Sequence, residues 1–360
     1  MTAPPDIRRP GAVDAPWLTR ALQSAGVDAV VRAFEARPVG TGQIGDSVRF
    51  KLAYERRGES APASLVGKFP AADPDSFNTG AGGGNYLREV MFYRHLAASA
   101  LISTPRWYVA ELDEASGEFV LLMEDLAPAE QGDQLKGVSL DQARLVVDEA
   151  AKLHASHWGD ESLEERPWIL WSRAGSMRPT PPGPVQAMWR AFHERYAERL
   201  APQVVEAGAR LAERIERFRT LSQSPRCLTH NDFRPDNMMF ATAAGGRPVT
   251  VLDWQSVGLG AGPGDVGYFL AGALAPDLRR AHEAELLTRY HQGLLSLGVT
   301  GYDAKALRVD YATGGLRLLM TTFMASMVVE QTARGDDMFM QMARSATAHI
   351  HDNDALGLLA

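Results

Sequence analysis

Apolar and polar residues alternate in the first third of the chain. Polar and apolar residues alternate through most of 47–54; successive side chains of an extended backbone point to opposite faces, so this alternation predicts a β-strand. A short apolar run at 64–69 predicts a second strand, and two more are expected around 107–109 and 118–123. Before them, residues 15–26 have the apolar spacing of a short helix.

Residues 71–84 are rich in Gly, Asp and Pro and predict a flexible insert between the second strand and the next helix. Asn85 is expected to be the N-cap of that helix, over 85–98. Its apolar positions are Tyr86, Leu87, Val90, Phe92, Tyr93 and Leu96.

The remainder of the chain is predominantly helical in pattern. A helix is expected over 139–157, one long amphipathic helix over 185–221, and further helices from 263 to the end, with breaks near 298–303 and 335–337. Strands rich in one part and helices in another indicate an α+β fold with two lobes. We expect a small antiparallel-sheet lobe over 1–125, with 1–29 as a leading segment and helix, a short connector near 124–128, and a larger, mostly helical lobe over 126–360.

Composition narrows the possible partners. The 360 residues are 45% hydrophobic and 22% charged, as in a folded soluble protein, and carry a net charge of -7, which disfavours a nucleic-acid partner. No apolar run approaches the length of a membrane span, and prolines near the start disfavour a signal peptide. The single Cys227 suits a reducing cytoplasm. We expect a cytoplasmic monomer or weak homodimer.

The strongest chemical pattern lies at residues 230–237, which read His-x-Asp-x-x-x-x-Asn, the spacing of a kinase catalytic loop. In that loop Asp232 orients or deprotonates an acceptor hydroxyl, and the Asn237 amide offers an oxygen to Mg²⁺. Asp253 ends a short apolar strand further on, where kinases keep a magnesium ligand. Asn, Asp and Pro also populate plain turns, but a turn does not account for Asp253, so the combination favours phosphoryl transfer.

A glycine-rich stretch precedes the first strand. Gly40, Gly42 and Gly45 form a literal G-x-G-x-x-G. A dinucleotide-binding fold requires a helix directly after these glycines, whereas here a strand follows, so a hairpin is expected and a dehydrogenase is disfavoured. The hairpin fits a flap over phosphates, with a simple glycine turn as the alternative.

The chain resembles the choline-kinase-like and aminoglycoside-phosphotransferase-like small-molecule kinases, and most closely the branch with bacterial relatives of ecdysteroid kinases. The resemblance runs from about residue 30 to 350 and implies a protein-kinase-like fold, ATP and Mg²⁺ as cofactors, and a small-molecule hydroxyl as acceptor. The residues that carry it are 228–237, 252–255 and 262–270, with 122–126 as the hinge and 151–158 as the following helix.

The resemblance also implies roles for residues outside the catalytic loop. Lys68 would grip the ATP phosphates and Glu89 would pair with Lys68. Backbone groups of Glu124 and Leu126 would hold adenine, and Arg234 occupies the place of a lysine that touches the γ-phosphate in protein kinases. For Arg234 a surface or structural role is an equal alternative.

Other positions in these motifs suggest supporting roles or depart from the family pattern. His230 and Asp265 are expected to orient the loop by hydrogen bonds, and His154 to be structural. Asn231 stands where many relatives have Gly. No Ala-Pro-Glu motif follows Asp253, which disfavours a protein substrate.

The acceptor is less constrained than the reaction. Methionines and other apolar residues on the C-terminal helices favour a rather apolar alcohol, although helix packing is the commoner explanation for any one of these residues. The alternatives are an aminoglycoside or other antibiotic O-phosphotransferase, for which acids are few, and a pseudokinase that binds nucleotide without transfer. The apolar residues are Tyr311, Leu316, Leu319, Met320, Phe323, Met324, Met327, Met338, Phe339 and Met342; the acids are Asp336, Asp337, Asp352 and Asp354.

Overall fold

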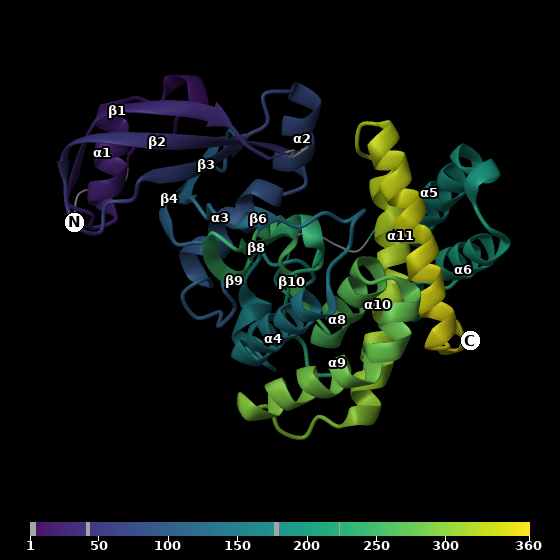
Figure 1. The fold of residues 1–360 in the computed structure, drawn as a ribbon. Coiled ribbons are helices and arrows are strands. Elements are labelled where there is room, and N and C mark those ends of the chain that lie inside the picture. Colours follow the sequence, from purple (N-terminus) through teal and green to yellow (C-terminus); the bar gives the residue numbers. More distant parts are fainter. Residues whose placement is uncertain (1–4, 41–43, 176–179, 223) are drawn as a thin grey trace. The chain divides into compact units, whose positions relative to one another are not determined.

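The computed structural model describes residues 5–40, 44–175, 180–222 and 224–360 (Figure 1). Contacts divide the chain into two compact units. Unit 1 comprises Met1–Ser99, Ser103–Pro128 and Val251–Ser256, and unit 2 comprises Ala100–Ile102, Ala129–Thr250 and Val257–Ala360. Unit 1 thus also includes a short segment from the later part of the chain, Val251–Ser256, which contains Asp253.

Unit 1 is built on a five-stranded antiparallel sheet in the order β1-β2-β3-β5-β4. All four strands predicted from polarity are present, because each presents apolar side chains to a core that helix α1 (Ala15–Ser24) also fills. Trp17 and Leu18 of α1 pack there with Phe50 and Leu65. The strands are β1 (Ala29–Pro38), β2 (Gly45–Arg57), β3 (Ser64–Pro70), β4 (Trp107–Leu112) and β5 (Phe119–Glu124).

The expected insert at 71–84 contains a helix, α2 (Pro74–Gly82), so the prediction of a flexible segment was wrong. The Asp73 side chain caps it by accepting from the N–H of Ser76, and Pro74 starts the helix without needing a donor. The next helix, α3 (Asn85–His95), has Gly84 rather than Asn85 as its N-cap, because residue 84 adopts φ +67°, which glycine accepts without strain.

Unit 2 is predominantly helical, as predicted, with two small sheets that pair β7 with β10 and order β6-β8-β9. Its helices are α4 (Leu140–Ser156), α5 (Pro182–Arg195), α6 (Pro202–Glu213), α7 (Ile215–Phe218), α8 (Gly262–Ala273), α9 (Pro276–Ser296), α10 (Ala304–Ala325) and α11 (Ala333–Asp352). Its strands are β6 (Glu130–Gln131), β7 (Cys227–Thr229), β8 (Met238–Thr242), β9 (Gly245–Val251), whose last residue belongs to unit 1, and β10 (Gly258–Gly260).

The long helix expected over 185–221 is three helices, α5, α6 and α7. The break comes at Ala201, which is extended, and at Pro202, which begins α6. Proline lacks the N–H that a helix interior needs and is tolerated in the first turn, so a helix cannot run through it without distortion.

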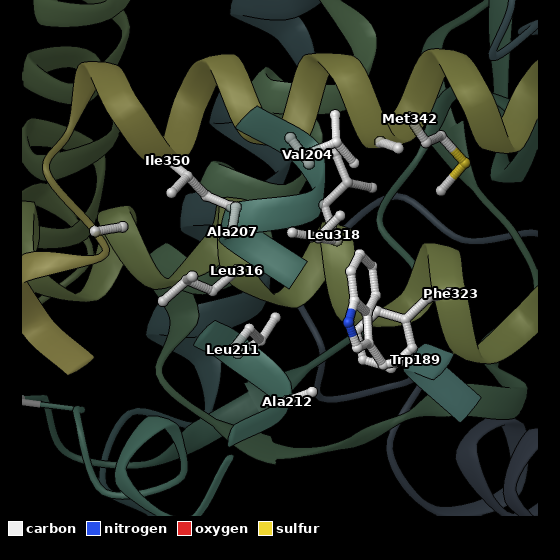
Figure 2. Close-up of a cluster of buried hydrophobic side chains, with 14 of the residues drawn as sticks. Trp189, Val204, Ala207, Leu211, Ala212, Leu316, Leu318, Phe323, Met342 and Ile350 are labelled. Atoms are coloured by element: carbon white, nitrogen blue, oxygen red, sulfur yellow. The ribbon is translucent and has the colours of Figure 1, made fainter. Parts of the chain in front are cut away.

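A large hydrophobic core of unit 2 lies between α5, α6, α10 and α11 (Figure 2). The Trp189 and Phe323 rings meet edge to face at 5.7 Å, and Met342 and Ile350 of α11 belong to the same cluster. This packing fixes α10 and α11 against the rest of the unit. Among the described helices, none combines the length and the apolar character needed to cross a bilayer.

Candidate active site

In unit 1, a buried ion pair joins strand β3 to helix α3. Nζ of Lys68 lies 2.7 Å from Oε2 of Glu89, whose side chain is 2% exposed, and 3.2 Å from Oδ1 of Asp253. Burial pushes the pKa of Lys68 down, but the negative charges of Asp253 and Glu89 outweigh it, so its pKa lies above the ordinary value. The pairing predicted between Lys68 and Glu89 is therefore present, and Lys68 carries its charge beside two carboxylates.

Asp253 lies just after β9 with a left-handed backbone, φ +63°, which is strained for a residue other than glycine. Its Oδ2 accepts from Nε2 of Gln255 at 3.2 Å. The Gln255 carbonyl in turn accepts from Nε of Arg88 at 2.6 Å, and Trp254 stacks on Phe92 with ring centroids 3.8 Å apart. Helix α3 thus holds the Asp253 segment by contacts from its buried face.

The hinge residues lie at the end of β5. The Glu124 N–H donates to the Arg106 carbonyl at 2.8 Å, and Glu124 Oε1 accepts from the Arg106 N–H at 2.7 Å. The next residue, Asp125, accepts from Ser64 Oγ at 2.7 Å. Leu126 follows directly and is partly exposed.

Gly40 follows β1 and Gly45 begins β2, and these two strands pair as the hairpin that the sequence predicted. Gly40 has φ +77°, which favours glycine, and a side chain at Gly45 would meet the Phe69 carbonyl at 3.0 Å. Gly42 lies outside the described residues. Strand β2 follows these glycines in place of the helix that a dinucleotide-binding site requires.

In unit 2, the carboxylate of Asp232 receives hydrogen bonds from three side chains. Asn237 Nδ2 donates to its Oδ2 at 2.8 Å, Arg234 Nε lies 3.2 Å away, and the Tyr268 hydroxyl donates to its Oδ1 at 3.1 Å. Burial alone would raise the pKa of Asp232, but the Arg234 charge and these donors lower it below the ordinary value. Asp232 is therefore ionised at neutral pH.

Asn237 occupies a buried position in the short 3₁₀ turn Pro235–Asn237. Its amide nitrogen also donates to the backbone carbonyl of Asp232 at 2.9 Å, so the amide oxygen faces away from Asp232. Such an oxygen suits a hard cation. The described residues contain no group of three or more His, Cys, Asp or Glu side chains arranged to hold a metal.

The backbone of the 230–237 loop is held by Asp265, in the first turn of α8. Its carboxylate accepts from the N–H groups of His230 and Asn231 at 2.7 and 3.1 Å. His154 Nε2 lies 3.4 Å from the same carboxylate, and the other His154 ring nitrogen lies 2.8 Å from the Tyr290 hydroxyl. Burial would raise the pKa of Asp265, but the His154 contact and nearby positive charges lower it.

Asn231, the departure from glycine, has φ +66°. Asparagine is among the side chains that tolerate this conformation best. Its Oδ1 accepts from Arg317 Nη1 at 2.5 Å and from Thr229 Oγ1 at 3.2 Å. These bonds from α10 and β7 compensate for the strain of a left-handed residue.

Arg234 is bonded to acids of its own loop. Besides Asp232, its Nη1 contacts Asp236 Oδ2 at 2.8 Å and the Met338 sulfur at 3.6 Å. Burial lowers the pKa of Arg234, but these two carboxylates raise it beyond the ordinary value, so the guanidinium remains charged. Through Met338, helix α11 reaches the catalytic loop.

Two residues of these clusters were not predicted from the sequence. Arg88, the neighbour of Glu89, holds the Gln255 carbonyl. Tyr268 lies in a continuous apolar run on α8, where an aromatic residue indicates packing rather than a hydroxyl directed at Asp232. The sequence carries no signal that distinguishes the two for Tyr268.

A sequence profile of the Phosphotransferase enzyme family, also known as APH, matches residues 77–307, well over half of the chain. The chain belongs to this family. The matched region of this phosphotransferase includes Glu89, Asp232, Asn237, Asp253 and Tyr268, whereas Lys68, Arg317 and Met338 lie outside it. Among curated proteins, no sequence matches it.

Solved structures support the fold of this phosphotransferase. A Ralstonia eutropha JMP134 protein described as an aminoglycoside phosphotransferase has a TM-score of 0.53 at 17% identity, over 95% of this chain and 98% of that one. The microcompartment-associated aminopropanol kinase gives 0.52 at 16%, over 96% and 100%. The Plasmodium vivax ethanolamine kinase gives 0.53 at 13%, over 91% and 87%. The α+β, protein-kinase-like fold predicted from the sequence is thus confirmed.

Proposed function

We propose that this phosphotransferase uses ATP and Mg²⁺ to transfer the γ-phosphoryl group to a hydroxyl of a small, rather apolar molecule. The observation that carries the proposal is that the Asp232 carboxylate, on the predicted catalytic loop, is ionised and accepts hydrogen bonds from three side chains. Phosphoryl transfer needs an oriented acceptor and cations around the phosphates more than it needs covalent chemistry, and the described residues offer both.

In unit 1, Lys68 would bind the ATP phosphates, with Glu89 keeping its ammonium in place. The charge of Lys68 supports this role, because an ammonium beside buried carboxylates stays protonated. Gly40, Gly42 and Gly45 would cover the phosphates. At the hinge the Glu124 N–H is already bonded to Arg106, so Glu124 would act toward adenine as an acceptor, and Leu126 as a donor.

In unit 2, Asp232 would accept a hydrogen bond from the acceptor hydroxyl and orient its oxygen for attack. A carboxylate with a lowered pKa is a weak base, so its main contribution would be orientation, with the proton passing to it late in the reaction. Arg234 would keep a positive charge beside the group that is transferred.

Magnesium would neutralise the negative charge that spreads over the phosphate oxygens. The residues present fit this cation: the Asn237 amide oxygen faces away from Asp232, and each Asp253 oxygen, bonded to Lys68 or to Gln255, has a second lone pair. Magnesium is usually held by one or two protein oxygens together with substrate phosphates and water, so a larger cluster of acids is not required.

The surroundings of Asp232 in unit 2 support a rather apolar acceptor. Met338 contacts Arg234, which contacts Asp232, so a thioether lies near the catalytic carboxylate. Met338 belongs to a set of partly buried methionines, and thioethers adapt to varied apolar ligands. The set, here called the methionine face, comprises Met188, Met320, Met324, Met327 and Met338.

Structural neighbours include kinases named for amino alcohols and for aminoglycosides, whose cationic acceptors call for acids. Three of the four acids that could serve this purpose already have partners within the chain. Asp336 accepts from the Tyr196 hydroxyl at 2.5 Å, and Asp337 lies 2.7 Å from Arg199. Asp352 is bonded to Arg280 at 2.9 Å. These pairings favour an uncharged acceptor over an aminoglycoside.

The proposal is tested by screening alcohols for ATP consumption with Mg²⁺ present, using Asp232→Asn as the inactive variant and Asp141→Asn, at an exposed position of α4, as the matched control. We expect Asp232→Asn to lower kcat by roughly 10²–10⁴-fold, the usual contribution of such a group. Full turnover by that variant contradicts the role of Asp232.

Two further outcomes separate the alternatives. Preferential phosphorylation of aminoglycosides contradicts the apolar acceptor. ATP binding without transfer to any acceptor or to water identifies a pseudokinase; binding itself is visible as stabilisation of about 2.7 kcal/mol at a hundredfold excess over Kd.

A further inference from the structure

We propose that Tyr268 is a positioning residue for the reaction, whose hydroxyl holds the catalytic carboxylate of Asp232 in the orientation needed for transfer. The inference rests on the proposed function, because it assigns Tyr268 a role through Asp232. Tyr268 lies outside the 230–237 loop, on helix α8.

The direction of the hydrogen bond is fixed by the protonation of the two groups. Asp232 is ionised and can only accept, so Tyr268 Oη donates to Oδ1 across 3.1 Å. The Tyr268 side chain is fully buried, and burial together with the negative charge of Asp232 raises its pKa well above the ordinary value. The hydroxyl therefore keeps its proton, and remains a donor, at every pH at which the protein works.

The position of Tyr268 is rigid because α8 touches α10 without intervening side chains. A methyl group added at Gly267 would clash with the Tyr311 carbonyl, and one added at Gly314 would clash with the Tyr268 N–H. These contacts fix the backbone on which the Tyr268 ring is carried. A donor on a fixed helix restrains an acceptor more tightly than a donor on a loop does.

The other two donors to Asp232 cannot provide this restraint. Arg234 and Asn237 belong to the same loop as Asp232, so they move with it. Tyr268 is the donor that connects the carboxylate to a helix of unit 2, α8. With Oδ1 held by Tyr268 and Oδ2 by Asn237, the plane of the carboxylate is set, and the remaining lone pairs keep a constant direction toward an acceptor hydroxyl.

Helix α10 also carries part of the methionine face. Tyr268 belongs to the same hydrophobic cluster as Leu316 and Phe323 of α10, and the partly buried Met320 and Met324 pack against that cluster. The ring that orients Asp232 thus belongs to the cluster that supports part of the proposed acceptor surface.

The experiment compares Tyr268→Phe with Tyr302→Phe, a matched control that removes a buried hydroxyl bonded to the Asp310 carboxylate at 2.9 Å instead of Asp232. With the acceptor found in the screen, or with water as acceptor in MgATP hydrolysis, we expect Tyr268→Phe to lower kcat about tenfold. KM for ATP should stay within about twofold, because Lys68 and Asp253 are untouched.

The split between kcat and KM distinguishes positioning from general destabilisation. Loss of a donor that orients Asp232 should lower kcat while KM for ATP stays in place. Tyr302→Phe should leave both constants in place. An unchanged kcat in Tyr268→Phe, or the same fall in both variants, overturns the proposal.

A stability cycle keeps the inference separate from the proposed function. The effects of Tyr268→Phe and Asp232→Asn on the urea midpoint should be non-additive, because the hydrogen bond between the Tyr268 hydroxyl and the charged carboxylate exists only in the parent. Additive effects overturn the contact. If the parent protein transfers phosphate to no acceptor and not to water, the proposed function fails, and the catalytic part of this inference fails with it, whereas non-additivity still supports the contact.

Discussion

The Lys68 ammonium lies 2.7 Å from the Glu89 carboxylate, with only 15% and 2% of the two side chains exposed. Such a pair contributes little net stability, since desolvation opposes the attraction, but removing one partner alone leaves a buried charge uncompensated. This asymmetry allows the stability of unit 1 and the proposed binding of phosphate by Lys68 to be measured separately.

We expect Lys68→Met to destabilise the protein by about 3 kcal/mol, because Glu89 loses its countercharge, and to raise KM for ATP or abolish transfer. The double variant Lys68→Met/Glu89→Leu should recover most of that stability and none of the transfer. Urea unfolding and ATP turnover measure the two effects.

The control for Lys68 is Lys51→Met, at an exposed position of β2, which should change stability by less than about 0.5 kcal/mol and leave turnover intact. Recovery of ATP turnover in the double variant is the result that contradicts a role for Lys68 in binding phosphate.

Asn231 offers a test of backbone strain in the catalytic loop. At φ +66°, Asn231→Val should cost about 1–3 kcal/mol, because a β-branched side chain is strained in this conformation. Asn231→Gly should cost less, since glycine accepts this φ and the variant loses only the bonds to Arg317 and Thr229. Urea unfolding of the two variants gives the comparison, and equal costs would show that the side-chain bonds outweigh the strain.

A buried histidine far from the catalytic loop in sequence predicts a pH dependence of stability. His349 of α11 is fully buried, neither ring nitrogen has a hydrogen-bond partner among the described residues, and burial lowers its pKa to about 3, with Arg279 adding to the effect and Asp352 opposing it. The Tyr311 ring packs against it at 4.7 Å.

Unfolded histidine takes up a proton near pH 6.5, whereas folded His349 does so only near pH 3, so the stability that it contributes is present above pH 6.5 and is lost as the pH falls. Between pH 7 and 5 the parent should lose about 2 kcal/mol more than His349→Leu, as measured by urea unfolding at both values. An equal loss in the two proteins contradicts a neutral buried His349.

Much of the fold and part of the site could be predicted because local patterns dictate them. Alternating polarity identifies strands of unit 1, and a lysine ending the apolar run of β3 needs a nearby acid, which Glu89 on the following helix supplies. The spacing from His230 to Asn237 identifies the loop, since the hydrogen bond from Asn237 to Asp232 is local in sequence.

The rest depends on contacts between distant parts of the chain. The α2 helix was missed because its glycines suggested a loop, yet Gly80 is needed where the Tyr86 ring leaves no room for a side chain. Tyr268 reaches Asp232 only because α8 packs as it does, and an aromatic residue in an apolar helix gives no indication of where its hydroxyl points. The burial of His349 is likewise decided by α10, through Gly315.

Because Gly267 and Gly314 are in backbone contact, different positions of α10 have different functions. Where α10 meets α8, substitutions would shift the catalytic machinery, so that side of the helix has little freedom to vary. Met320 and Met324, on the same helix, are partly exposed. A library that randomises the methionine face and spares the glycines would therefore be expected to yield variants with new acceptor ranges and an undisturbed catalytic loop.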